Sequence, residues 1–203
     1  MIIVMMRSKM SSFLAHSIVG YSIAQQEKSL TIQTHIFTSL FFIVLASSPD
    51  IDYAINYLRG ESFSIRYTHS IGYIFLIGIF AVILKYLFFR NILEYSSNIF
   101  LFIAPLSHLI LDGLVGVHGN PYLYPFSETL FTFPYGILPS SGRIDFGNYY
   151  FWRNLLIELG LFIPFLFAIT PAFRAYIKNK KYFIWLLLII FIIALLIGLN
   201  LDR

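Results

Sequence analysis

Long hydrophobic runs alternate with polar segments along most of the chain, and this pattern predicts a helical membrane protein. Five runs are long enough to cross a bilayer as α-helices, at residues 30–48, 70–89, 98–117, 154–173 and 182–200. A shorter and more polar run at residues 10–25 is either a short or tilted span or a helix inserted part-way. We therefore expect an all-α, polytopic membrane helical bundle with five or six transmembrane helices.

Two substantial segments separate these runs, at residues 49–69 and 118–153. The second is rich in Pro, Gly and aromatic residues and lacks a helical period, which predicts an ordered, irregular loop at headgroup depth. In the first, Ser48 followed by Pro49 is typical of a helix start, and this predicts a short helix over residues 49–58. With no internal repeat, we expect residues 1–203 to form a single membrane-embedded domain.

Composition supports a membrane location and excludes several classes of site. The chain is 58% hydrophobic and 12% charged, whereas a soluble domain carries about twice that charged fraction. The net charge of +4 is modest, so no nucleic-acid partner is expected. The absence of cysteine excludes disulfides and thiolate metal sites.

Lysine and arginine positions predict the orientation. With the sides numbered by the five long runs, one side carries seven of these residues, and this side should be cytoplasmic. The other side carries four, Arg59, Arg66, Arg143 and Arg153, so both long loops should face outward. Arg7 and Lys9 fit a cytoplasmic start only if residues 10–25 do not fully cross, which the sequence leaves open.

Four short segments hold ionisable side chains that are rare in membrane helices, because each costs roughly 2.5–3.5 kcal/mol or more at the bilayer centre. These side chains are His16, Asp50, Asp52, His69, His108 and Asp112. His108 and Asp112 are four residues apart and share a helix face. The segment 49–69 returns His69 to the neighbourhood of the aspartates, so a divalent metal site formed by His and Asp is predicted.

Other polar residues are weaker candidates. Residues two apart on a helix face different ways, so one aspartate of the pair Asp50 and Asp52 is the expected ligand, and the other is a supporting or bridging group. His35 has no acidic neighbour and is expected to hydrogen-bond between helices. His118 is a further candidate for a metal ligand or proton carrier. Glu158 is a candidate for an additional acid of the site.

The order of these segments also carries a family resemblance. His16, PDID, THS and HxxxD, followed by HGNPYLYPF, resemble the bacterial inner-membrane metal-dependent hydrolases known as the LexA-regulated hydrolase family. That family looks related to the zinc-dependent phospholipase C and P1 nuclease group. Over about residues 10–160, the resemblance implies one to three zinc ions, with these metal ligands: His16, Asp50, His69, His108 and Asp112. The family often has HRGxTHS where this chain has SIRYTHS, with Ser64 in place of the first His, so the number of metals stays open.

These observations predict a membrane-embedded metal-dependent hydrolase of the bacterial inner membrane, with its site facing the periplasm. A metal-activated water would attack a phosphoester of a phospholipid or lipid-linked substrate, a substrate class implied mainly by the resemblance. Asp52, or its neighbour Asp50, would act as general base, and Arg66 would neutralise developing charge. A metal-ion or proton transporter, or a scaffold acting with a partner, is the alternative; the oligomeric state stays open.

Overall fold

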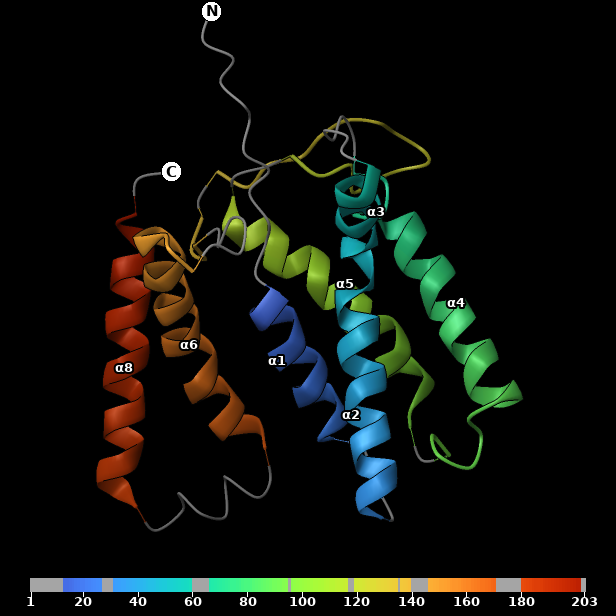
Figure 1. Ribbon diagram of the computed structural model, residues 1–203, viewed down its shortest axis with the longest axis horizontal. Coiled ribbons are helices and arrows are strands. Elements are labelled where there is room, and N and C mark those ends of the chain that lie inside the picture. Colours follow the sequence, from blue (N-terminus) through green and yellow to red (C-terminus); the bar gives the residue numbers. More distant parts are fainter. Residues whose placement is uncertain are drawn as a thin grey trace, which may run out of the picture.

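The computed structural model describes residues 13–26, 31–59, 66–94, 96–116, 119–134, 136–139, 146–170 and 180–201. Within these ranges the protein is helical, and an isolated bridge between Asn120 and Phe131 is the sole β-type pairing (Figure 1). The helices are α1 (Phe13–Ala24), α2 (Ile32–Ser47), η1 (Ser48–Asp50), α3 (Ile51–Arg59), α4 (Ile71–Leu87), α5 (Asn98–Val115), α6 (Tyr149–Ile169) and α8 (Lys181–Leu199). The predicted all-α class is confirmed.

Four helical segments of the described part are long and apolar enough to cross a membrane, namely Ile32–Ile55, Asn98–Val115, Tyr149–Ala168 and Lys181–Leu199. Helix α4 is apolar but has 17 residues, and α1 has 12. A helix of that second length extends about 18 Å, well short of the roughly 30 Å hydrocarbon core of a bilayer. The expected five or six spans are therefore supported for four among the described helices.

Helices α1 and α5 lie at the centre of the bundle. Helix α1 packs against α2, α5 and α6, while α5 also packs against α2 and α4, and α6 pairs with α8. One hydrophobic core joins α1, α2, α4 and α5, and a second joins α1, α5, α6 and α8. Because α1 and α5 belong to both cores, the side chains that they carry are held from several directions.

Helix α2 continues into α3 through the η1 turn. The predicted helix start at Ser48 is wrong, because Ser48 has helical backbone angles and its hydroxyl donates to Leu45 O at 2.8 Å. Pro49 is accommodated at the start of η1, where a missing N–H leaves no intrahelical bond unmade. The predicted short helix is present as α3. Asp50, in η1, and Asp52, in the first turn of α3, thus lie near the C-terminal end of the Ile32–Ile55 segment.

The loop after α5 is irregular and is tied to the helix ends by backbone hydrogen bonds. Helix α5 ends at Gly116, whose φ of 66° is a conformation that glycine adopts at little cost. Beyond it, Tyr122 O accepts from Ile71 N at 2.9 Å, and Leu114 O accepts from Leu138 N at 3.0 Å. The described parts of this loop thus cover the start of α4 and the end of α5.

Charged residues fall at the two ends of the bundle in the predicted manner where they are described. The end of α4 and the start of α8, which carry Lys85 and Lys181, lie opposite α3 and the start of α6 (Figure 1). Lys85 is buried, not solvated, because its Nζ donates to Asn98 Oδ1 at 3.0 Å and also to Ser96 O. Several of the lysines and arginines used to predict the orientation, including Arg143, lie outside the described residues.

Helix α1 approaches α2 most closely at Gly20. A Cβ at this position would lie 2.6 Å from Phe42 O and 2.8 Å from the Cα of Ile43, which are backbone atoms that cannot rotate away. Gly20 lies one turn after His16 on the same helix, so the close approach also sets the position of that imidazole.

Replacing Gly20 with alanine is expected to push α1 away from α2 and to displace His16. Overpacking of this kind costs about 1–3 kcal/mol, so thermal denaturation in detergent should show a lower midpoint, and elemental analysis should show less bound metal. Gly160→Ala is the matched control, because its Cβ would lie 2.7 Å from Ala194 Cβ, between α6 and α8. It should lower stability while bound metal is kept; equal metal loss in both variants would contradict the role of Gly20.

Candidate metal centre

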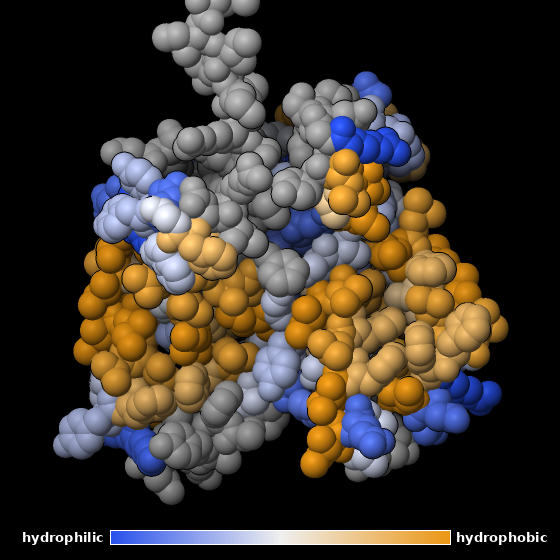
Figure 2. Space-filling model, viewed as in Figure 1, coloured by the Kyte–Doolittle hydropathy of each residue, from blue (hydrophilic) through white to orange (hydrophobic). Residues whose placement is uncertain are grey.

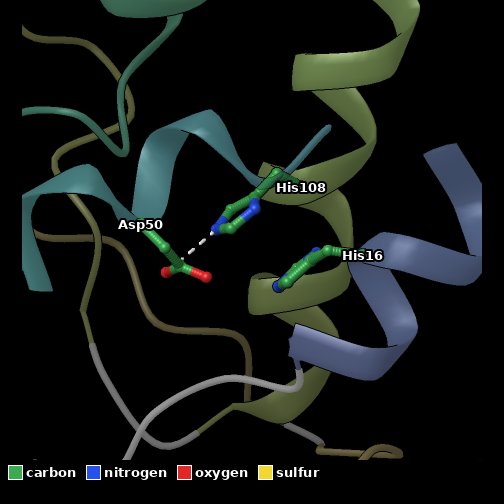
Figure 3. Close-up of side chains that lie close together, drawn as sticks. All are labelled: His16, Asp50 and His108. Atoms are coloured by element: carbon green, nitrogen blue, oxygen red, sulfur yellow. Dashed lines mark ion pairs between the residues drawn. The ribbon is translucent and has the colours of Figure 1, made fainter. Parts of the chain in front are cut away.

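Five elements bring the predicted ionisable residues together near one end of the bundle. His16 comes from α1, Asp50 from η1 and His108 from α5, and Figure 3 shows these three side chains pointing toward one another. We call the full set the His/Asp cluster: His16, Asp50, Asp52, His69, His108 and Asp112. Its imidazoles are almost completely buried, with exposures of 1% or less for His16, His69 and His108.

Two overlapping groups in the cluster have metal-site spacing. His16, Asp50 and His108 form one group, and His69, His108 and Asp112 form the other; in each, the potential ligand atoms lie within 4.8 Å of one another. His108 Nε2 is 3.4 Å from Asp50 Oδ1, and His69 Nε2 is 3.1 Å from Asp112 Oδ2. His16 Nε2 is 3.3 Å from Asp112 Oδ1, and its ring stacks on His108 at 3.6 Å. All five predicted ligands are thus brought together.

The surroundings of two imidazoles fix which nitrogen faces the cluster. His108 Nδ1 donates to Ala46 O at 2.9 Å, which leaves the Nε2 lone pair directed at the other ligand atoms. His69 Nδ1 lies 3.4 Å from Asp52 Oδ2, and its Nε2 lies 3.2 Å from His108 Nε2. This pattern, with a backbone carbonyl or carboxylate behind each imidazole, is typical of metal-binding histidines.

The chain positions His69 through a short turn. His69 N donates to Arg66 O at 2.9 Å, and α4 begins directly afterwards with Ser70 as its N-cap, whose hydroxyl accepts from Tyr73 N at 3.2 Å. Thr68 Oγ1 donates to Asp52 Oδ2 at 2.7 Å and so holds that carboxylate behind the ring.

Asp112 provides a test of whether the residues fit a cation. Both of its carboxylate oxygens are buried, and they receive no hydrogen bond of good geometry from the described residues. Their close contacts are ion pairs with imidazole and guanidinium nitrogens. A buried carboxylate needs compensating positive charge. Nitrogen and carboxylate donors without sulfur suit a divalent ion such as Zn²⁺.

Arg66 enters the cluster from the turn before α4. Its Nη1 is 3.2 Å from Asp112 Oδ2 and its Nη2 is 3.4 Å from Asp50 Oδ1. Nη2 also contacts His69 Nε2, and the guanidinium lies 4.5 Å from the centre of the Tyr53 ring. Arg66, which the sequence predicts to neutralise developing charge, therefore lies between the carboxylates of Asp50 and Asp112.

In the absence of metal, His69 is the proton-binding group of this cluster. Burial lowers the pKa of His69, but its close contacts with the carboxylates of Asp112, Asp50 and Asp52 outweigh burial and raise this pKa to about 9. His69 is thus protonated at neutral pH in the metal-free protein, and with Arg66 it balances most of the carboxylate charge. A metal ion at His69 must displace that proton.

Metal binding is therefore expected to depend on pH. From about pH 7 to 9 the apparent affinity should rise by roughly tenfold per pH unit, since one proton leaves His69, and it should level off above the pKa. Competition titrations of Zn²⁺ against a chromogenic chelator, corrected for chelator protonation, would measure this slope. In His69→Gln the slope should flatten; an unchanged slope in that variant would contradict the assignment.

Some predicted residues do not join the cluster. Glu158 is buried in α6 and belongs to neither metal-spaced group, whereas His118 and Ser64 lie outside the described residues. His35 hydrogen-bonds Gln25 at 3.1 Å, as expected for a residue joining helix ends.

Sequence reasoning missed the supporting groups Thr68, Tyr53 and Ala46 O. The position of Thr68 directly before His69 could have indicated its supporting role. The backbone carbonyl of Ala46 could not be recognised, because every residue has one.

Comparison with known proteins gives one family match. A family model described as YdjM inner membrane protein matches residues 10–202. No curated protein and no solved structure matches the chain. The matched range includes the whole cluster and supports a bacterial inner-membrane location. It provides no support for the expected relation to metal-dependent hydrolases or to the phospholipase C and P1 nuclease group.

Proposed function

We propose that this chain, which belongs to the YdjM inner membrane protein family, is a metal-dependent hydrolase embedded in the bacterial inner membrane. The proposed substrate is a phosphoester of a phospholipid or lipid-linked compound, and the proposed site faces the periplasm. The observation that carries this proposal is the convergence of five His and Asp side chains, four of them buried and Asp50 partly buried, from α1, η1, the turn before α4, and α5. Burying so many ionisable groups in a membrane protein is energetically costly, and such groups usually mark a functional site.

The cluster residues His16, Asp50, His69, His108 and Asp112 would hold Zn²⁺. When bound, this ion supplies Lewis acidity and a water of lowered pKa. Both metal-spaced groups use His108, and one imidazole nitrogen binds one ion. A single divalent ion together with Arg66 also balances the charge of three carboxylates. We therefore favour one ion per chain among the one to three that the sequence allows.

The chain's own side chains have separate roles in this mechanism. Arg66 presents a planar guanidinium that can bind two phosphate oxygens and stabilise charge that develops on them. Asp52 holds His69 through Oδ2, while its Oδ1 is buried and accepts no hydrogen bond from the described residues. That second oxygen is available to take a proton, so Asp52 combines a positioning role with that of general base.

Asp52→Asn is expected to show both roles. Loss of the carboxylate behind His69 should lower metal affinity by about 10–100-fold, and loss of the base should leave the rate at saturating metal about 10²–10⁴-fold low. Metal titration combined with assays of phosphoester hydrolysis separates the two effects. Thr68→Val is the matched control, because it removes the hydroxyl that contacts Asp52 and His69 Nδ1 but keeps the Asp52 carboxylate, so it should recover full rate at saturating metal. Full recovery in Asp52→Asn would limit Asp52 to positioning.

Bound-metal stoichiometry and hydrolysis together test the proposed function. Purified protein should contain about one zinc per chain and should release a phosphorylated product from a phospholipid panel, with activity lost to a chelator and restored by Zn²⁺. Protein that binds no metal, or that cleaves no phosphoester with metal bound, would contradict the proposal.

A transporter would instead move Zn²⁺ or protons across the membrane of liposomes without hydrolysing a substrate. Flux measurements on the same purified protein, reconstituted in liposomes, would detect this. A scaffold would keep its cellular function in an Asp50→Asn, His69→Ala double variant.

A further inference from the structure

Tyr122 bonds to two segments that carry residues of the His/Asp cluster. Its carbonyl oxygen accepts from Ile71 N at 2.9 Å, and this N–H belongs to the first turn of α4, where a helix offers no acceptor of its own. Its hydroxyl donates to Leu109 O at 3.3 Å. Ile71 comes two residues after His69, and Leu109 comes directly after His108. One loop residue therefore joins the turn that carries His69 to helix α5.

The surface of α5 leaves room for this phenol at Gly113, the residue after Asp112. A Cβ at Gly113 would lie 3.0 Å from the Tyr122 hydroxyl oxygen and 2.7 Å from the ring of Phe133. Any larger residue would push the phenol or the Phe133 ring outward, so the close approach of the loop depends on this glycine. The hydroxyl thus lies against α5 one residue away from a cluster carboxylate.

Asn120 supports the same hydroxyl from within the loop. Its side chain is almost fully buried, and its Nδ2 donates to Tyr122 Oη at 3.4 Å. Its backbone N–H and C=O both pair with Phe131 at 3.0 Å, which fixes this part of the loop. Burial raises the pKa of the Tyr122 phenol, and the negative charge of Asp112 raises it further. The phenol is therefore protonated, as a donor to Leu109 O must be.

Hydrogen bonds matter at this place because packing alone is a weak constraint on position. Figure 2 shows apolar surface along the middle of the bundle and more polar surface toward its ends. Apolar contacts between α4 and α5 are non-directional, whereas a hydrogen bond restricts both distance and direction. A metal site needs that precision, because its ligand distances are held within about 0.2 Å.

We propose that Tyr122 is a positioning residue of the metal centre, which sets the place of His69 relative to His108 and Asp112 on α5. This inference rests on the proposed function and deepens it, because it adds a residue that no cluster spacing identifies. Both bonds of Tyr122 to these segments are made with backbone atoms, so Tyr122 acts through the His69 turn and through α5, not as a ligand.

Zn²⁺ affinity measured in two backgrounds tests the proposal. Tyr122→Phe keeps the backbone bond to Ile71 but loses the bond to Leu109 O, so Zn²⁺ affinity should fall by about tenfold, as for other supporting groups of metal sites. In a His69→Gln background, the same substitution should change the affinity by less than about twofold, because the residue that Tyr122 positions is gone. A general loss of structure would lower the affinity equally in both backgrounds. Competition titrations against a chromogenic chelator measure both ratios.

Bound Co²⁺ provides a readout of ligand geometry that does not depend on affinity or activity. At saturating Co²⁺, the visible absorption band should change in position or intensity in Tyr122→Phe. Tyr124→Phe is the matched control from the same loop, where the Tyr124 ring packs against Tyr67, and it should keep the wild-type affinity and spectrum. Asn120→Ala removes only the support of the Tyr122 hydroxyl, so it should lower Zn²⁺ affinity by a smaller factor.

The outcomes separate this inference from the proposed function. Unchanged affinity or an unchanged Co²⁺ spectrum in Tyr122→Phe, an equal loss in both backgrounds, or the same loss in Tyr124→Phe refutes the positioning role while metal binding stands. If Tyr122→Phe does not fold, unchanged affinity in Asn120→Ala refutes it instead. If the wild-type protein binds neither Zn²⁺ nor Co²⁺, the proposed function fails, and this inference fails with it.

Discussion

Replacing His108 with alanine should abolish metal binding and hydrolysis together, with metal affinity reduced by at least about 100-fold. His108 is the residue that both metal-spaced groups share. Its ring also stacks on His16 and is fully buried, so no other side chain can take its place without moving α1 or α5. Elemental analysis of purified protein and the assay of phosphoester hydrolysis measure the two losses.

Two further variants make the His108 result specific. His108→Asn keeps an amide donor near the position of Nδ1 for Ala46 O, so it should preserve helix content and the thermal midpoint better than alanine does, yet still lose metal. His35→Ala removes a histidine that bonds Gln25 away from the cluster, and it should keep both metal and activity. A metal-free His108→Ala protein with full activity would refute the proposed metal mechanism.

Replacing Arg66 with methionine should separate metal binding from turnover. The guanidinium lies between Asp50 and Asp112, at 3.4 and 3.2 Å, and is 8% exposed. Removing its positive charge leaves more negative charge for a cation, so Zn²⁺ affinity should stay equal or rise. Hydrolysis should fall by about 10²–10³-fold, because a donor to the phosphate is lost.

The same substitution should make stability depend on metal. Removing one partner from a buried ion cluster typically costs about 3–5 kcal/mol, so metal-free Arg66→Met should denature at a lower temperature than metal-free wild type. Zn²⁺ should restore most of the difference, since it replaces the missing charge. Arg66→Lys, which keeps the charge but loses the planar fork, should retain stability and lose part of the rate. Loss of metal binding in Arg66→Met would contradict these roles.

Much of the fold follows from local sequence. The apolar runs predict the helices because their lengths match a bilayer, and observed ends at Thr31, Ser70 and Gly116 carry cap residues that act locally. The run at 10–25 was ambiguous because its length falls between that of a span and that of a buried helix. The helix start at Ser48 was mispredicted because a serine–proline pair also fits where one helix passes directly into the next, as α2 does into η1 and α3.

In the candidate site, too, some features follow from local sequence and others only from tertiary packing. Its ionisable residues are visible in the sequence because charge is rare in apolar runs, and the spacing of His108 and Asp112 alone places them on one face. What required the tertiary structure was the arrangement across elements. The contact of α1 with α2 at Gly20, the Ala46 carbonyl behind His108 and the insertion of Arg66 among carboxylates depend on packing between distant segments.

The sequence by itself thus determined the helical membrane class and the set of residues available for chemistry, because hydrophobic length and charge in apolar runs are local properties. Only the tertiary structure decided which nitrogen of His108 and His69 faces the cluster and where Arg66 lies. Those features arise from contacts between residues far apart in the chain, and helical periodicity does not encode them.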